Sequence, residues 1–495
     1  MRTIWVLGDQ LNRRIGALAD ADPARDRVLL VESRALVERP GVHRQRLHLV
    51  LASMRRFGRE LAEAGFEIDQ RRAATLEEGV RAHLDDHDPD ELVTTEANSW
   101  AGRALQRRLG ATVAPSNQFL CHPDEFAAWA GDRRSPVMED FYRWHRSRLG
   151  YLMDGDQPAG GRWNFDDQNR EPPPRDGRRW PRPVRSRLDD LDREVVDELP
   201  PGAWGADPVG WWPTSRRAAL ARLRHAVDEV LPRFGPHEDA MLSTSWHLAH
   251  TMLSPALNLG LLLPGEVADA VEGSYRAGGV PIASAEGLLR QVIGWREYVW
   301  GTYWRQGPAY RDVNALGATR ALPPVLDGRA GTDMRCVADV MASLHDHGWT
   351  HHIPRLMVLG NLCLIAGVDP KHLSDWMTAR FVDGADWVML PNVQGMSQHA
   401  DGGIMATKPY AAGGAYIDRM SDYCGGCRYD RTARTGPDAC PFTTLYWDFI
   451  DRHRDRWVRN PRVSRAVGGY DRLTDRDGIP RRAAEVLARL DEGTL

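Results

Sequence analysis

The chain has 495 residues, which is long enough for two or three domains with substantial hydrophobic cores. A net charge of −4, with 42% hydrophobic and 27% charged residues, excludes a protein that attracts nucleic acid over its whole surface, so any such site must be a local patch. The chain shows no apolar leader after Met1, no apolar stretch of eighteen residues and only six cysteines, so we expect a cytoplasmic protein without membrane segments or a disulfide scaffold.

The first 130 residues alternate short apolar stretches with a helical pattern. Residues 3–8, 27–33 and 91–97 are predicted to be buried parallel strands, and residues 43–65 have apolar positions at helical spacing. Strand–helix alternation of this kind is typical of an open α/β sheet. The sequence therefore predicts an α/β domain with an open parallel sheet at the N-terminus.

The first predicted strand ends in the sequence LGDQL, which lacks the glycine pattern of a dinucleotide-binding fold. Ligands of open α/β sheets nevertheless bind beyond the carboxyl ends of the strands. A pocket is therefore predicted beside four residues at such ends: Asp9, Gln10, Leu11 and Glu32.

Glycine and proline interrupt every periodic pattern between residues 154 and 187, which predicts a long connector. Its second part, residues 170–187, carries seven arginines against Glu171 and Asp176. One interpretation is a solvated linker. The other is an arm that lies on phosphate groups, with Trp180 available to stack on a base.

Apolar residues recur at intervals of three and four beyond residue 205, and strand-like alternation is missing. The second domain is therefore predicted to be all-α. We expect three parts: an α/β domain over residues 1–132, an interdomain linker over 133–205 and a helical domain over 206–495.

Three of the six cysteines lie close together near the C-terminus. Cys424 and Cys427 are separated by two glycines, which allow the backbone to turn tightly around a metal, and Cys440 follows thirteen positions later. This spacing is typical of metal ligands and leaves zinc, an iron–sulfur cluster and no metal as alternatives. The proline after Cys440 mildly favours an iron–sulfur cluster.

Three thiolates require a fourth ligand. Cys121 belongs to the predicted α/β domain, and Cys363 lies in an apolar helical stretch where a buried inert thiol is expected. Cys336, at a predicted helix start, is the best remaining candidate.

Longer stretches of sequence resemble the prokaryotic iron–sulfur branch of the photolyase/cryptochrome family. The resemblance covers essentially the whole chain, and the set Cys336, Cys424, Cys427 and Cys440 is similar to the ligand pattern of that branch. The stretches that carry it are LGDQL near the N-terminus and residues 279–301, 348–370, 382–403 and 406–427.

The resemblance implies an antenna-binding α/β domain, a long interdomain loop and a helical domain that binds FAD. It also implies a 4Fe-4S cluster and a 6,7-dimethyl-8-ribityllumazine antenna. The implied activity is light-driven repair of (6-4) pyrimidine photoproducts in UV-damaged DNA by a monomeric protein. The alternatives are a cryptochrome-type photoreceptor with the same cofactors and a non-photochemical iron–sulfur flavoprotein.

Three groups of residues correspond to flavin-binding positions in the proteins that this sequence resembles. Read without the resemblance, they would be a helix cap, a surface face with a core tryptophan, and solvated loop residues. The groups are Thr251, Leu253 and Ser254; Arg290, Gln291, Trp295 and Arg296, which also face the lesion; and Asp383, Asp386 and Asn392.

His352 is similar to the active-site histidine of the family, whereas the adjacent His351 is expected to be structural. A general-acid role is expected for His352, because repair moves a hydroxyl group back between two bases and an imidazolium can donate the proton. Arg355, Tyr410 and Tyr416 correspond to the rest of the lesion pocket. The lesion has to leave the base stack to reach this pocket.

The sequence departs from the family in its aromatic electron relay. Trp376 keeps the first position, but Met377 stands where a tyrosine is expected, and residues 323–335 contain no aromatic residue. We therefore expect slow photoreduction of FAD that begins at Trp376, with Trp387 and Trp295 as candidates for a detour among eighteen tryptophans.

Overall fold

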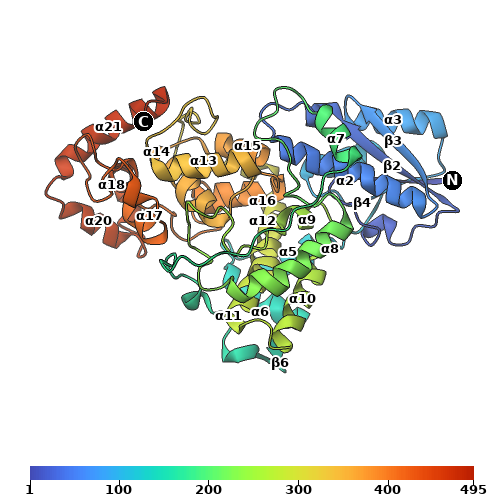
Figure 1. Cartoon of the computed structure of the whole chain (residues 1–495), viewed down its shortest axis with the longest axis horizontal. Coiled ribbons are helices and arrows are strands. Elements are labelled where there is room, and N and C mark those ends of the chain that lie inside the picture. The colour runs from blue at the N-terminus through green and yellow to red at the C-terminus, as the bar shows by residue number, and fades with distance from the viewer.

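The structure, a computed structural model, describes residues 1–495 and shows a sheet at the N-terminal end and helices in the remainder (Figure 1). Five parallel strands form the sheet in the order β3-β2-β1-β4-β5. Ile4 in the central strand pairs with Val28 on one side and Val93 on the other. The strands are β1 (Arg2–Val6), β2 (Asp26–Ser33), β3 (Glu67–Ala73), β4 (Leu92–Thr95) and β5 (Thr112–Ala114).

The predicted open α/β class is confirmed, and β1, β2 and β4 lie where the apolar stretches predicted strands. Strands β3 and β5 were not predicted. Both are edge strands, and β3 consists largely of charged or amide side chains that are partly or fully exposed, so neither carries an apolar pattern.

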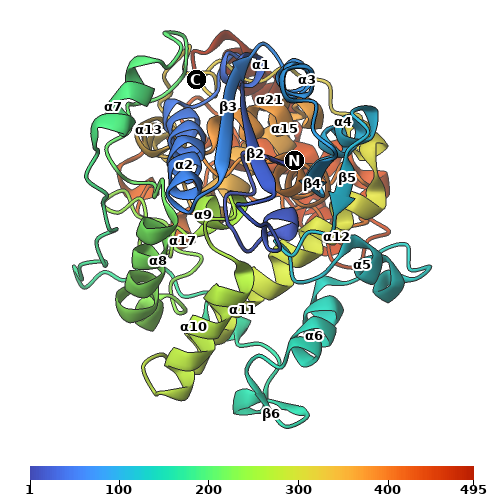
Figure 2. The same cartoon turned by 90° about the vertical axis from the view of Figure 1, so that its right-hand side faces the viewer.

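Helices cover both faces of the sheet (Figure 2). Helix α2 (Arg44–Glu63) packs on the face that carries Ile4 and Val28, while α3 (Leu76–His87) and α4 (Trp100–Arg108) pack on the face of Trp5 and Leu29. Adjacent strand residues point to opposite faces, so a sheet covered on both sides has apolar residues throughout its inner strands. The short helix α1 (Arg34–Val37) follows β2.

The connector predicted for residues 154–187 is confirmed as an irregular segment. Helices α5 (Pro123–Ala130) and α6 (Met138–Leu149) precede it, and a two-residue hairpin of β6 (Met153–Asp154) and β7 (Gln157–Pro158) begins it. Between residues 169 and 189 there is no helix or strand. Helix α7 (Asp190–Asp197) then returns to pack against α2.

The chain after residue 205 is helical, as predicted, and contributes no strand to any sheet. Its helices are α8 (Arg216–His225), α9 (Ser254–Asn258), α10 (Pro264–Arg276), α11 (Ile282–Leu289), α12 (Arg296–Gln306), α13 (Arg335–His347), α14 (Asn361–Ala366), α15 (Pro370–Arg380), α16 (Asp386–Pro391), α17 (Gly414–Met420), α18 (Pro441–Arg452), α19 (Arg454–Trp457), α20 (Ser464–Asp471) and α21 (Ile479–Glu492).

Two large hydrophobic cores hold the molecule together. The first joins the α2 face of the sheet to α5, α6 and α10–α12, and the second lies among α13–α21. Three π-helical segments, Arg290–Trp295, Pro354–Gly360 and Asn392–Ser397, lie where these cores meet. Such wide turns are rare and occur mostly at functional sites. No helix is both long and apolar enough to cross a lipid bilayer.

Candidate functional site

A cavity of about 470 Å³ lies at the junction of the two cores. Its size is in the range of small-molecule and cofactor sites, which is roughly 300–1,000 Å³. The three π-helical segments and the chain around α9 supply much of its wall. Most of the predicted flavin and lesion residues line it together: Thr251, Leu253, Ser254, Arg290, Gln291, Trp295, Arg296, His352, Arg355, Asp383, Asn392 and Tyr410.

Asp383 is the centre of a buried network on this wall. Its carboxylate accepts a hydrogen bond of 2.7 Å from the Ser254 hydroxyl and forms two contacts, of 2.9 and 3.0 Å, with the Arg355 guanidinium. The Arg355 guanidinium also lies 4.1 Å from the centre of the Phe381 ring. Asp383 is thus held from two other elements instead of being solvated in a loop, and it fixes the position of Arg355.

His352 forms the second charged pair of the cavity. Its Nε2 lies 3.1 Å from an Asp239 carboxylate oxygen. Burial disfavours the charged ring, but the hydrogen bond and negative charge of Asp239 outweigh it and raise the pKa of His352 above its usual value. His351 and His250 stack on each other at 4.2 Å, and burial lowers the pKa of both well below the usual value. Of the two adjacent histidines, His352 is therefore the one that can carry a proton.

Glu238 is a cavity residue that was not predicted. Its side chain is 7% exposed, and Oε1 accepts a 2.9 Å hydrogen bond from the Gln291 amide. Burial raises the pKa of this carboxyl to about 8. The cavity thus holds a neutral acid beside the charged Asp239–His352 pair. The only signal in the sequence is two adjacent acids, Glu238 and Asp239, which is a weak one.

The connector also contributes to the cavity. Asp166, Asn169 and Arg170 line it, and Asp166 pairs with Arg290 at 2.9 Å. The first part of the segment that was predicted to be a linker therefore closes one side of the cavity.

The cavity wall fits a bound cofactor that is rich in hydrogen-bond acceptors. Arg296 pairs with Glu297 through Nη1 at 2.7 Å, but its Nε and Nη2 are buried without a partner. The Nε of Arg290 and the Nε2 of His250 are also buried and unpaired. Buried donors without partners are costly, so a group with phosphate, hydroxyl or ring acceptors would stabilise this wall.

Three of the residues predicted to contact the flavin or the lesion, or to begin the electron relay, do not line the cavity. Asp386 begins α16, Tyr416 lies on α17, and Trp376 lies on α15 with its indole N–H donating to the Leu326 carbonyl at 2.9 Å. Met377, the residue that replaces the expected tyrosine, does line it.

The four residues predicted beside the antenna are already bonded within the chain. Asp9 is partly buried and accepts from Asn98 at 3.0 Å, Gln10 donates to the Glu96 carbonyl, and the Leu11 amide donates to Leu259 of the helical part. Glu32 forms two contacts of 2.8 and 2.9 Å with the buried Arg55.

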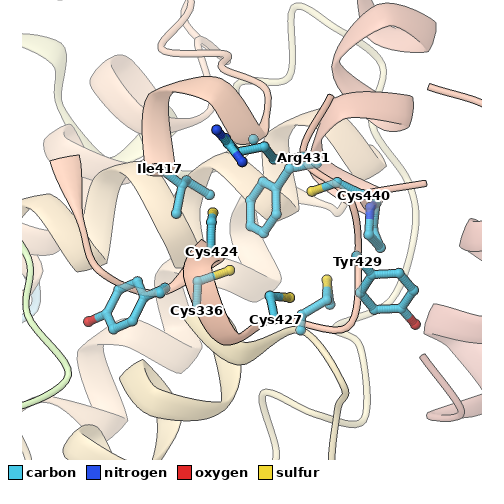
Figure 3. Close-up of a pocket in the computed structure, with 12 residues that line it drawn as sticks. Cys336, Ile417, Cys424, Cys427, Tyr429, Arg431 and Cys440 are labelled. Carbon is cyan, nitrogen blue, oxygen red and sulfur yellow. The ribbon is translucent and has the colours of Figure 1, made fainter. Parts of the chain in front are cut away.

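A second, smaller cavity is lined by all four predicted metal ligands (Figure 3). Cys336 lies in the first turn of α13, Cys424 and Cys427 lie on one tight turn, and Cys440 immediately precedes α18. All four are free thiols. Cys121 and Cys363 are buried in the first and second hydrophobic cores and take no part.

The surroundings of these thiols suit a metal centre with sulfur ligands. Met334, Ile417 and Phe442 contribute apolar lining, and burial together with the three neighbouring thiols raises the pKa of Cys336. A buried cluster of thiols gains stability when soft metal ions take up the thiolate charge. The donor set fits an iron–sulfur cluster or zinc, which the spacing had left open.

Comparisons with known proteins agree with this arrangement. The family model for deoxyribodipyrimidine photo-lyase-related protein matches residues 4–202. A (6-4) photolyase from Agrobacterium fabrum is 39% identical over 505 aligned residues, which cover 99% of both chains. This relative spans the sheet, the cavity and the cysteine site alike.

Two solved structures share the fold. A bacterial class III photolyase from Agrobacterium tumefaciens has a TM-score of 0.58 and 17% identity over 99% of this chain and 98% of its own. A cryptochrome from Synechocystis sp. PCC6803 has a TM-score of 0.56 and 13% identity over 98% of this chain and 99% of its own. At these identities they show the fold alone.

Proposed function

This chain belongs to the photolyase/cryptochrome family, and we propose that it is a light-driven DNA photolyase that repairs (6-4) pyrimidine photoproducts. The observation that carries the proposal is the full-length relative that is itself a (6-4) photolyase. The pairing of His352 with Asp239 inside a cofactor-sized cavity supports it, because this repair needs a proton donor at the lesion.

FAD is the cofactor that the family implies, and the residues that line the cavity fit it. The unpaired donors of Arg290, Arg296 and His250 would meet its acceptors, and Ser254 and Asp383 would hold it from the opposite element. A bound, reduced flavin would supply light-driven one-electron chemistry to the lesion and would recover the electron afterwards. The reaction therefore has no net redox change.

The residues of the chain act on the proton and on the position of the lesion. His352 holds a proton at Nε2 against Asp239 and donates it toward the base that receives the hydroxyl group. Tyr410 lines the cavity and is proposed to contact the lesion there, where Arg355 is kept in place by Asp383. Tyr416, which lies outside the cavity lining, stays part of the proposal as a lesion contact. The arginines of residues 170–187 are proposed to lie along the DNA phosphates.

The four-cysteine site is proposed to hold a 4Fe-4S cluster, with Cys336, Cys424, Cys427 and Cys440 as its ligands. A 6,7-dimethyl-8-ribityllumazine antenna beside Asp9, Gln10, Leu11 and Glu32 remains part of the proposal. The proposal also includes domain boundaries at residues 132 and 205, a cytoplasmic location and a monomeric state.

A cryptochrome-type photoreceptor is the second candidate. The observation that favours it is the altered relay, in which Met377 lines the cavity and residues 323–335 supply no aromatic ring. A protein with this altered relay would keep the cofactors of a photoreceptor without repair turnover.

One experiment decides between the two candidates. The purified holoprotein, with its flavin chemically reduced, is illuminated with oligonucleotides that carry either one (6-4) photoproduct or one cyclobutane dimer. We expect restoration of the (6-4) site alone. If neither lesion is restored, the photoreceptor candidate replaces the photolyase.

A further inference from the structure

We propose that electrons reach the cavity from the surface through Trp349, Trp246 and Trp211, and not through Trp376. This inference rests on the proposed function in one respect only: it requires an oxidised flavin in the cavity to accept the electron. It names the route by which the resting protein becomes active.

The three indole rings form a continuous line from the cavity to the surface. Trp349 is 5% exposed and lines the cavity, and its ring centre lies 5.8 Å from that of Trp246. Trp246 lies 5.3 Å from Trp211, and both of these rings are partly exposed. Hopping of an electron requires oxidisable rings at short and regular separations, and indole is the most easily oxidised side chain that this line could use.

Trp376 lacks the neighbours that a relay needs. It does not line the cavity, and the aromatic ring next to it is Phe381 at 6.2 Å. Phenylalanine is much harder to oxidise than tryptophan or tyrosine. A positive charge formed on Trp376 would therefore have no easily oxidised ring in contact with it to move to.

A second tryptophan line leaves the cavity at Trp387, but arginines flank it at both ends. Trp387 lies 5.8 Å from Trp300, and Trp300 lies 5.4 Å from Trp304. The Arg296 guanidinium lies 5.2 Å from the Trp387 ring and is paired with Glu297 through Nη1 alone, so two of its nitrogens are unpaired. The Arg103 guanidinium lies 3.7 Å from the Trp304 ring and has only a long contact, of 3.7 Å, with Glu96. Loss of an electron makes an indole ring positive, so a nearby cation opposes the loss.

The charges that face the three rings of the Trp349 line are compensated, neutral or screened, and the buried Arg222 donates to the Trp211 carbonyl instead of facing a ring of the line. The Arg355 guanidinium is 5.8 Å from Trp349, but its charge is compensated by the two contacts with Asp383. Trp246 stacks at 3.8 Å on His347, and burial lowers the pKa of His347, which keeps that ring neutral. Arg185 lies 4.7 Å from Trp211, where it is exposed and screened by water.

Electrons balance in a simple way along this line. Trp349 passes one electron to the excited oxidised flavin, Trp246 refills Trp349, and Trp211 refills Trp246. A thiol reductant in solution then returns Trp211 to its starting state, so no bond of the chain is made or broken. Two such transfers oxidise two thiols to one disulfide and release two protons, while the flavin gains two electrons.

The test compares Trp246→Phe with a matched variant of the other line, Trp304→Phe, and with Trp376→Phe. Photoreduction of the bound flavin is followed by absorbance under anaerobic blue light with dithiothreitol. We expect Trp246→Phe to slow it at least tenfold, because the middle of the line is removed, and Trp304→Phe to keep the rate of the parent protein. An unchanged rate of photoreduction in Trp246→Phe would overturn the route. So would a loss of photoreduction in Trp376→Phe or in Trp304→Phe that Trp246→Phe does not share.

A second measurement does not depend on any variant folding. The parent protein is illuminated without dithiothreitol in the presence of oxygen, and oxygenated tryptophans are mapped by peptide mass spectrometry. We expect them at Trp211 and Trp246, and their appearance at Trp304 or Trp376 instead would contradict the route. Repair that starts from chemically reduced flavin should survive in Trp246→Phe, so failure of the route and failure of the photolyase proposal are distinguishable.

Discussion

The cysteine site and the large cavity are built in opposite ways. The cysteine site is apolar, and three of its four ligands come from residues 424–440. The cavity mixes apolar side chains with polar and charged ones, which the fold collects from the connector, α9, the three π-helical segments and the chain near residue 383. A compact metal site of the first kind stabilises the fold itself, whereas the second kind uses the fold to position charges for chemistry.

Removal of a cysteine ligand is expected to have the largest effect. Cys424→Ser should lose the metal, and soluble protein should fall sharply, because the remote Cys336 and the local thiols tie α13 to the segment before α18. Iron and acid-labile sulfide are measured in anaerobically purified protein. Cys363→Ala is the matched control, since it empties part of the second core and should keep full iron content while costing about 1–2 kcal/mol. Stoichiometric zinc without sulfide would contradict the cluster.

His352→Ala should act on chemistry and leave the fold intact. The variant is expected to keep FAD. Its rate of (6-4) repair should fall by about 10²–10⁴-fold, which is the usual contribution of a general acid. In the parent protein, repair should decline as the pH rises through the raised pKa of His352, because only the protonated ring can donate. The rate of repair per photon absorbed is measured from pH 6 to 9. Parental repair by the variant across this range would remove His352 from the mechanism.

Asp383→Asn should weaken the cavity wall by a smaller amount. It leaves the part-buried Arg355 without its partner, which is expected to cost about 3 kcal/mol of the free energy of unfolding and to lower FAD retention. A double-mutant cycle with Arg355→Gln, measured by chemical denaturation, isolates the pair. The double variant should be less unstable than the sum of the two single ones. Strict additivity would mean that the pair contributes nothing.

The same contrast explains which features the sequence could predict. Cys424, Cys427 and Cys440 are close along the chain, so their spacing alone indicates a metal site. The inner strands were predictable because burial on both faces requires continuous apolar stretches. Edge strand β3 was not, since its exposed charged side chains resemble those of a loop.

The cavity could be assigned from sequence only through the family resemblance. Arg355 and Asp383 are 28 positions apart, and nothing in their local sequences indicates that they pair. Glu238 shows the limit most clearly, because its raised pKa results from burial by Gln291 and other residues far along the chain. Chemistry that depends on desolvation is fixed by tertiary packing, and a local pattern does not record it.

Glu238 gives the most specific prediction, a dependence of stability on pH. The pKa of this carboxyl is about 8 in the folded protein and ordinary in the unfolded chain, where the value for glutamate is 4.5. Between these values the folded state keeps the proton and the unfolded state releases it. Folding therefore becomes less favourable as pH rises, by up to about 1.4 kcal/mol per pH unit, and the loss ends above pH 8 when both states are ionised.

Glu238→Gln should remove this contribution, because the amide cannot ionise and can still accept the hydrogen bond from Gln291. The free energy of unfolding of the holoprotein is measured by denaturant titration at several pH values from 5 to 9. We expect a shallower decline in Glu238→Gln than in the parent protein, whereas Glu229→Gln, at an exposed helical position, should follow the parent. Equal slopes in all three proteins would show that Glu238 is already ionised at neutral pH. The cavity would then hold a charged acid next to Asp239, and His352 would lie in a more negative field than its pairing with Asp239 alone creates.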